Sequence, residues 1–350
     1  MTGHRATAEE IEGRAGRPTA GRSGIPGVLV AGITALISGL SVFVNSYGVH
    51  AIRAPAVYTT AKNLVATVVL AGCALGAWRV RRRWPSSAAA RFVSVEREDA
   101  VPVARRRARG PRRVLPWLGL AYVGTVGGGL AFVLFFDGLA DTTATPAAFG
   151  RDTLVIWVAI LAVPFLHERM HWWNWAAIAL LVGGEVVVAG GVGHLAPSRG
   201  QLLVLSASAL WALEVVVAKL LLRQVAPASL SLIRMGVGAI ALLGYLAASG
   251  SLRALPSLDA TQVGWAILTG LLLAAYVGTW MTALARARGL DVTSILVGSA
   301  LVTALLQAAA GTSSLAPRAV GLTLVTIGAG TVVWMGLRRP PFRRSEVFGE

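Results

Sequence analysis

The residues of this chain that are best placed to do chemistry are charged side chains inside long apolar runs. On insertion scales, one charge at the centre of a bilayer costs about 2.5–3.5 kcal/mol, so it must be paired, neutral or in contact with water. Charges retained in such places mark the pathways of substrates, ions or protons. Seven of the 350 residues have this placement: Lys62, Arg151, Asp152, Glu185, Glu214, Lys219 and Arg234.

Positions along the apolar runs predict two ion pairs. Arg151 lies 15 residues before a short turn between two runs, and Glu185 lies 14 residues after it. Glu214 lies 9 residues before a second such turn, and Arg234 lies 7 residues after it. Because a helix rises about 1.5 Å per residue, the two members of each pair reach a similar depth. We therefore expect the pairs Arg151–Glu185 and Glu214–Arg234.

The other charges have simpler expected positions. Lys62 and Asp152 both fall in the outer third of the membrane, so they are expected to partner each other. Lys219 lies near the cytoplasmic end of its run, from which its long stem can reach the headgroups. Two interpretations of the paired charges stay open. They are fixed pairs that set helix register, or cavity groups that bind a charged or zwitterionic substrate or carry a proton.

Two of these sites are the strongest candidates for function. Glu214 is the first candidate for a proton or cation site, and Trp211 lies one turn before it. Arg151 and Asp152 are the second candidate. Adjacent residues on a helix point about 100° apart, so both cannot face one partner helix and one is expected to face a cavity.

Aromatic and amide side chains extend this candidate binding set. Tyr276 and Trp280 are four residues apart, hence on one helix face, and with Trp211 they could form an amphipathic cavity wall. Core packing or an interfacial belt is the alternative for the tryptophans. Asn45, at the outer end of its run, is expected either to hydrogen-bond between helices or to cap one.

Other reactive residue types predict no catalytic or metal site. His167 and His171 are four residues apart beside Glu168, but the order is not HExxH and they fall in a short turn. The single cysteine, Cys73, excludes a disulfide framework and a multi-cysteine zinc site. The chain has no phosphate-binding loop or dinucleotide fingerprint. We therefore expect no enzyme activity, no metal and no cofactor.

The composition sets the elements that carry these residues. The chain is 55% hydrophobic and only 14% charged, where soluble domains carry about 25% charged residues. Runs of about 20 apolar residues predict membrane-spanning helices. Glycines in the third run (Gly124, Gly127, Gly128 and Gly129) predict close helix approach. Ten runs fall near 26–45, 57–78, 115–136, 144–165, 172–191, 200–222, 228–248, 262–285, 291–311 and 318–337.

The distribution of basic residues predicts the orientation. Tails at 1–25 and 338–350 and a linker at 79–114 with twelve arginines fall on one side, which collects 24 basic residues against 4 on the other. Both termini are therefore expected in the cytoplasm. The linker contains only Trp84 and Phe92 as aromatic residues, so no nucleic-acid partner is expected. Thirty arginines against two lysines favour a GC-rich genome and a bacterial inner membrane.

An internal repeat links the two halves of the chain, at 26–191 and 200–337. Five runs in each half is an odd number, so the two halves would lie inverted with respect to each other. An offset of 172 residues matches the second run to the seventh, and one of 145 matches runs three to five to runs eight to ten. The matches include Ala54-Pro55-Ala56 with Ala226-Pro227-Ala228, Lys62 with Arg234, and Gly183 with Gly328.

The stretch 135–190 carries a family resemblance. It contains the turn Leu166-His167-Glu168-Arg169, followed by Trp175 and Gly183-Gly184. This pattern resembles the first-half signature of EamA-type proteins of the drug/metabolite transporter superfamily. The second half is similar, but Ala309–Pro317 lacks the turn usual there. The resemblance spans about 26–337. It implies two inverted five-helix repeats, a site formed by runs 1, 3, 4, 6, 8 and 9, and export or exchange of small metabolites.

Together these features predict an all-α integral membrane protein with ten transmembrane helices in two inverted five-helix repeats. The expected function is secondary active transport by alternating access, which exports or exchanges a small metabolite, amino acid or drug, with protons as the candidate coupling ion. The protein would be a monomer or homodimer. The alternatives are a non-transporting scaffold or receptor, or an intramembrane enzyme. Expected binding residues are Glu214, Trp211, Arg151, Asp152, Lys62, Tyr276, Trp280 and Asn45.

Overall fold

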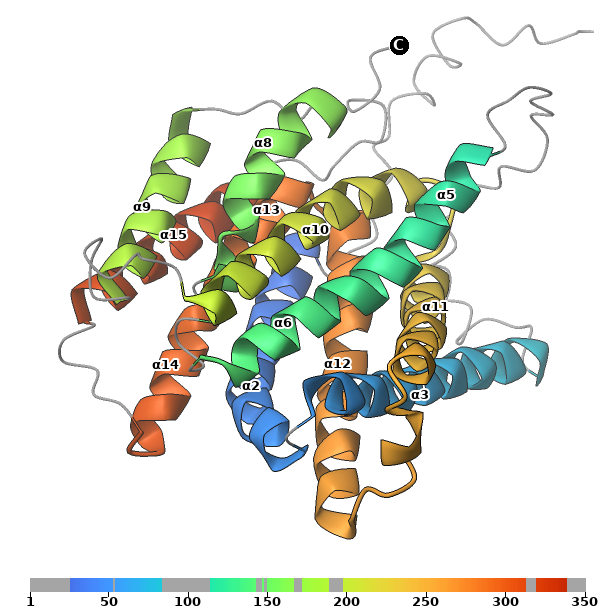
Figure 1. The fold of residues 1–350 in the computed structure, drawn as a ribbon. Coiled ribbons are helices and arrows are strands. Elements are labelled where there is room, and N and C mark those ends of the chain that lie inside the picture. Colours follow the sequence, from blue (N-terminus) through green and yellow to red (C-terminus); the bar gives the residue numbers. More distant parts are fainter. Residues whose placement is uncertain are drawn as a thin grey trace, which may run out of the picture.

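The regular structure of this protein is helical throughout the part that the computed structural model describes (Figure 1). The expected N-terminal tail, most of the basic linker and most of the C-terminal tail lie outside that part. The described residues are 26–52, 54–83, 114–142, 147, 150–166, 172–188, 198–312 and 319–338.

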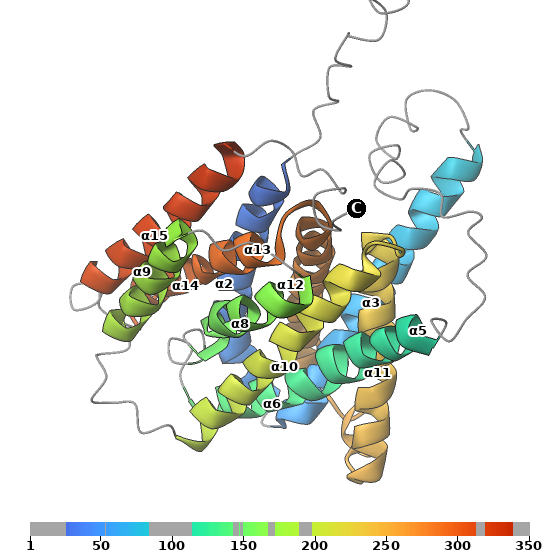
Figure 2. The same cartoon turned by 90° about the horizontal axis from the view of Figure 1, so that it is seen from above.

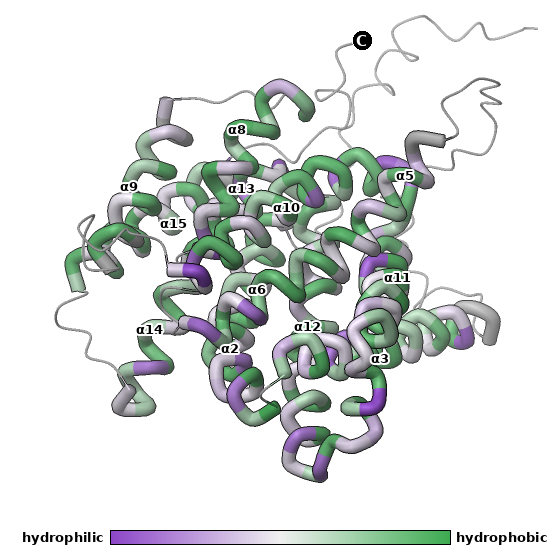
Figure 3. Tube along the Cα trace, viewed as in Figure 1, coloured by the Kyte–Doolittle hydropathy of each residue, from purple (hydrophilic) through white to green (hydrophobic). Residues whose placement is uncertain are grey.

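Seven stretches among the described residues are long and apolar enough to cross a membrane, which makes this an all-helical membrane protein. Hydrophobic residues make up large parts of these helices (Figure 3). The seven are α2 (Gly27–Ile52), α3 (Pro55–Arg83), the third stretch α5 (Val114–Tyr122) with η2 (Val123–Leu130) and α6 (Ala131–Ala140), α10 (Arg199–Leu221), α11 (Pro227–Ala248), α12 (Ala260–Arg286), and α13 (Gly289–Val297) with α14 (Ser299–Ala309).

The other three expected spans coincide with shorter helices. They are α8 (Leu154–Leu166), α9 (Trp172–Val188) and α15 (Ala319–Arg338). A short 3-10 helix, η4 (Leu252–Ala254), lies between α11 and α12. The helical segments therefore follow the order of the ten expected runs, while seven of them meet the length and hydropathy needed to span.

Local sequence sets where several helices begin. Pro55 opens α3 and Pro227 opens α11, and proline suits the first helical turn because its missing N–H would have no partner there. Ser198 and Asp259 form capping boxes with the glutamine three residues later, at the start of α10 and α12 respectively. These signals fix the helix starts independently of tertiary packing.

The third stretch has a π-helical segment, η2, between two α-helices. Its glycines pack against α11: a side-chain carbon added at Gly128 would overlap the carbonyl of Arg234, and one added at Gly124 would press on Val237. The close approach expected from these glycines is therefore present. It brings the backbones of η2 and α11 together beside Arg234.

The expected span near 291–311 is one of the seven candidate spans, at Gly289–Ala309, and it consists of two consecutive helices. The two helices meet at Gly298, whose backbone lies in the right-handed helical region, and α13 starts at Gly289. This start places Asp291 in the first turn, where it pairs with Arg288. Beyond Gly298, α14 packs on α2.

Helices from the two halves of the chain interleave. α12 packs against α2 and α3, whereas α10 packs against α6 and α8, and α11 packs against η2 and α3. The pair α9 and α15 lies to one side, next to α13 (Figure 2). The main core runs through both halves, and the charged residues lie where these helices face one another.

Candidate functional site

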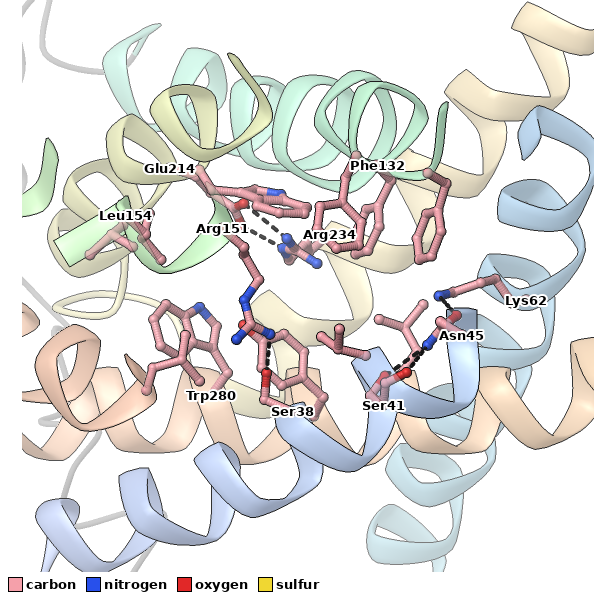
Figure 4. A pocket seen from close by; sticks show the side chains of 18 residues that line it. Ser38, Ser41, Asn45, Lys62, Phe132, Arg151, Leu154, Glu214, Arg234 and Trp280 are labelled. Atoms are coloured by element: carbon pink, nitrogen blue, oxygen red, sulfur yellow. Dashed lines mark hydrogen bonds and ion pairs between the residues drawn. The ribbon is translucent and has the colours of Figure 1, made fainter. Parts of the chain in front are cut away.

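A cavity between the interleaved helices contains about 670 Å³ of space not filled by atoms, part of it open to the outside. Its walls come from α2, α3, α6, α10, α11, α12, α13 and the residues at the start of α8 (Figure 4). The expected walls from runs 1, 3, 4, 6, 8 and 9 are all present, and α3 and α11 add to them. Seven of the eight expected binding residues line it: Asn45, Lys62, Arg151, Trp211, Glu214, Tyr276 and Trp280.

Glu214 and Arg234 form a buried ion pair in this cavity. The Arg234 Nε donates to one carboxylate oxygen of Glu214, and its Nη2 donates to the other at 2.9 Å. The same Nη2 also donates to the Gly127 carbonyl at 3.1 Å, to which the Trp211 indole N–H donates at 3.0 Å. The pair expected from helix depth is therefore present, and it is tied to the η2 backbone.

Arg151 has hydrogen-bond and ion-pair partners that its expected depth in the membrane did not predict. Its Nη2 pairs with Asp152 Oδ1 at 2.7 Å, and its guanidinium also donates to the hydroxyls of Ser38 and Ser299. These serines lie on α2 and α14. The side chain of Glu185, the expected partner, lies outside the described residues.

Asp152 lies behind Arg151 and is not among the residues that line the cavity. Of the two neighbours, Arg151 is therefore the one that faces the cavity. The second carboxylate oxygen of Asp152, Oδ2, is buried and accepts no hydrogen bond from the described residues.

The expected partnership of Lys62 with Asp152 is wrong. Asp152 pairs with Arg151, and the Lys62 Nζ donates to Asn45 Oδ1 at 2.7 Å. Tyr58 donates to the same amide oxygen at 2.5 Å. Asn45 thus makes the interhelical hydrogen bonds that were one of its two expected roles. The reason for the error is that depth does not tell which side of a helix a residue occupies.

The expected extension of Lys219 toward the headgroups is also wrong. Its Nζ donates to the carbonyls of Leu284 and Ala287, at 2.7 and 2.5 Å. These carbonyls lie at the end of α12, where helical carbonyls lack an intrahelical partner and a cation is favourable. Lys219 therefore fastens α10 to the end of α12.

Aromatic side chains form two walls of the cavity. The Tyr276 and Trp280 rings stack with centroids 6.0 Å apart, as their shared helix face predicts. Trp211 packs edge-on against Phe132 and tilted against Phe135, with centroids 5.4 Å apart in each contact. The aromatic wall expected from Trp211, Tyr276 and Trp280 is thus larger, because α6 adds phenylalanines.

Several cavity residues were missed from sequence. Ser38, Ser41 and Asn45 lie three and four residues apart on α2, so they form a polar stripe on one face of an apolar helix. That stripe is a signal that could have identified the two serines. The phenylalanines of α6 had no such signal, and neither did Ser299, which accepts a hydrogen bond from Arg151 but does not line the cavity.

The described residues contain no group of three or more His, Cys, Asp or Glu side chains placed to hold a metal. His167 and His171 lie outside the described part of the chain.

Comparisons with known proteins agree with the helical architecture. No curated protein matches the chain. Twenty-six chains of solved structures match it. One, titled only "Crystal structure of protein", has a TM-score of 0.60 and 17% identity, and the match covers 88% of this chain and 98% of that one. At this identity the likeness shows the fold alone. Residues 100–190 match the model of the EamA-like transporter family, so this part of the chain is similar to that family.

Proposed function

We propose that this protein is a secondary active transporter that exports or exchanges a small molecule by alternating access. The match of residues 100–190 to the EamA-like transporter family supports membrane transport of small molecules. The observation that carries the proposal is the cavity, which is charged, aromatic and lined from both halves of the chain. A site between two halves can be opened to either side when one half rocks against the other.

Two pairs of glycine contacts support an organisation in two related repeats. A side-chain carbon added at Gly27 would meet Arg286, and one added at Gly200 would meet Asp141. Gly27 and Gly200 differ by 173 positions, and Asp141 and Arg286 differ by 145. These are within one residue of the two sequence offsets. The first contact joins the start of span 1 to the end of span 8. The second contact joins the start of span 6 to the end of span 3, which are the matching positions in the other repeat.

The second pair of contacts lies beside the cavity. A side-chain carbon added at Gly128 would meet the carbonyl of Arg234, and one added at Gly270 would meet the carbonyl of Lys62. Lys62 and Arg234 are the residues matched by the offset of 172. This matched position of each repeat would therefore contribute a cation to the cavity, from a helix packed tightly on a glycine of the other repeat.

We further propose that the Glu214–Arg234 pair couples transport to protons. It is the one ion pair with both members lining the cavity, among the described residues. A proton on Glu214 would remove the charge that holds Arg234 and so change the net charge of the cavity. The protein would act in a bacterial plasma membrane with both termini in the cytoplasm, as the distribution of arginines favours.

The cavity also argues against the two alternative functions. An intramembrane enzyme would need clustered polar groups near the headgroups, and a scaffold or receptor would need no enclosed polar space. The charged groups of this cavity are 1–7% exposed and come from several helices. Such an arrangement suits a molecule that is enclosed on its way across the bilayer.

The proposal is tested by flux into liposomes that contain the purified protein, measured for a library of small metabolites with and without a pH gradient. We expect uptake or counterflow of some compounds, with rates that depend on the gradient. Glu214→Gln should abolish flux or uncouple it from the gradient. Asp141→Asn, which removes an exposed paired carboxylate outside the cavity, should leave flux unchanged. Gradient-driven flux of normal size in Glu214→Gln would exclude this carboxylate from coupling.

A further inference from the structure

The charges of the cavity are unbalanced. Three cations line it, Lys62, Arg151 and Arg234, against one carboxylate, that of Glu214. Arg234 is neutralised by Glu214. Arg151 is neutralised by Asp152, which does not itself line the cavity. Among the described residues, no carboxylate pairs with Lys62, which is 1% exposed.

The surroundings of Lys62 leave its ammonium group incompletely satisfied. An ammonium has three N–H donors, and one of them is used by Asn45 Oδ1 at 2.7 Å. The Nζ also lies 3.8 Å from the centroid of the Phe136 ring and 5.4 Å from that of Tyr58. Aromatic faces attract a cation but accept no strong hydrogen bond. Two donors are therefore available to a group in the cavity.

A cationic group has no comparable place to bind. Both oxygens of Glu214 already accept hydrogen bonds from Arg234. The unbonded oxygen of Asp152 belongs to a residue outside the cavity lining. An amine would also meet the positive charges of Lys62 and Arg151. The electrostatics of the cavity therefore favour a negative group over a positive one.

The remainder of the cavity is suited to an apolar body. Phe132, Phe135 and Trp211 form one wall, and the stacked rings of Tyr276 and Trp280 form another. Rings that bind in such a space pack in offset or edge-on arrangements.

We infer that the substrate is a small organic monoanion with an apolar or aromatic body, and that its negative group binds the Lys62 ammonium. This inference rests on the proposed transport function and names the class of molecule that the same cavity would take. The anion would accept the two available N–H donors of Lys62, and the body would lie against the aromatic walls. Asn45 acts as a positioning residue, since it holds the ammonium at the edge of the cavity (Figure 4).

The opposing interpretation is that Lys62 is structural. In that case the aromatic faces and Asn45 would satisfy the cation, and its removal would change stability but not the selectivity for ligand charge. The two interpretations differ in one measurable quantity, the effect of the charge at position 62 on the preference for an anionic ligand.

The test uses four probes that share a phenyl ring and differ in charge: 3-phenylpropionate, 3-phenylpropylamine, 3-phenylpropanol and L-phenylalanine. Their dissociation constants are measured on the purified full-length protein by tryptophan fluorescence, since Trp211 and Trp280 line the cavity. We expect the carboxylate to bind at least about tenfold more tightly than the alcohol and the amine, because one charge-assisted hydrogen bond supplies that difference.

The lysine variants assign the preference to a residue. Lys62→Met should lower affinity for the carboxylate about tenfold and leave the alcohol unchanged, whereas Lys62→Arg should retain most of the preference. Lys219→Met is the matched control, since the chain has two lysines and Lys219 does not line the cavity. Each variant is first checked for a monodisperse peak and a cooperative thermal transition.

Three outcomes would overturn the inference. They are equal or tighter binding of the amine or alcohol, an unchanged carboxylate preference in Lys62→Met, and absence of binding by all four probes. The wild-type comparison alone decides the first and third, so it does not depend on a variant that folds. Failure here concerns the substrate class only. Flux of other compounds in the liposome screen would still support the transporter, and absence of any flux there would refute the transporter itself.

Discussion

Arg234 of α11 holds both carboxylate oxygens of Glu214 of α10, and each of the two residues is 3% exposed. The two helices are joined by a short turn at 222–226, so the residues are near in sequence and face each other in space. The pair thus fixes the relative rotation of two neighbouring helices and places a neutralised charge in the cavity wall.

The first prediction concerns this pair. Arg234→Ala leaves a buried carboxylate without its partner and should lower the free energy of unfolding by about 3–5 kcal/mol. Adding Glu214→Gln should restore part of the loss, because the uncompensated charge is then gone. Unfolding of the single and double variants in detergent gives the coupling energy, which should exceed about 0.5 kcal/mol. Additive losses would show that the two side chains act independently.

A second prediction concerns the close approach of η2 and α11. Gly128→Ala places a carbon against the Arg234 carbonyl, so the helices must separate, and we expect a loss of about 1–3 kcal/mol with reduced flux. Gly244→Ala is the matched control on α11, because a carbon added there meets no atom within 4 Å. It should leave stability unchanged or slightly raised. Equal thermal stabilities for the two variants would contradict the packing argument.

A third prediction uses Asn45 to change the charge balance beside Lys62. Asn45→Asp is nearly isosteric and supplies the carboxylate that Lys62 lacks. The added negative charge should compete with an anionic ligand and lower the affinity for 3-phenylpropionate about tenfold or more. Asn45→Ala keeps the positive charge and should reduce this affinity less. Fluorescence titration compares the two, and an unchanged affinity in Asn45→Asp would place the anion elsewhere.

Substitution of Lys219 should change stability and leave ligand affinity the same, whereas substitution of Lys62 should change ligand affinity. Lys219→Met removes two hydrogen bonds to the end of α12, so we expect a loss of about 1–3 kcal/mol in stability. Ligand affinity should stay the same, because the side chain does not line the cavity. Thermal unfolding together with titration separates the two effects. A change in ligand selectivity without a change in stability would be inconsistent with a fastening role.

The final prediction concerns the inverted arrangement of the two repeats. The chain has one cysteine, Cys73, so Cys73→Ser gives a background for labelling. Pro26→Cys and Arg199→Cys place exposed thiols at the starts of α2 and α10. A membrane-impermeant maleimide should label the first from the cytoplasmic side and the second from the outer side. Labelling of both from one side would exclude inversion.

Sequence alone determined the helical elements and the depth of each charge, because hydropathy and rise per residue are local properties. It also predicted the Glu214–Arg234 pair, since a short turn forces the two helices to be antiparallel neighbours at matched depth. Seven of the expected binding residues meet in one cavity, because polar groups on apolar helices are buried against one another rather than exposed to lipid.

Only the tertiary structure decided which partners Lys62, Arg151, Asp152 and Lys219 take. Lys62 and Asp152 were expected at the same depth, but their side chains do not face each other. The hydrogen-bond partner of Lys62 is Asn45 of α2. Arg151 meets hydroxyls of α2 and α14, and Lys219 meets the end of α12. These contacts depend on how each helix is rotated about its axis and which helices are neighbours. Packing of small residues between distant segments sets both, and depth along a single helix carries no information about them.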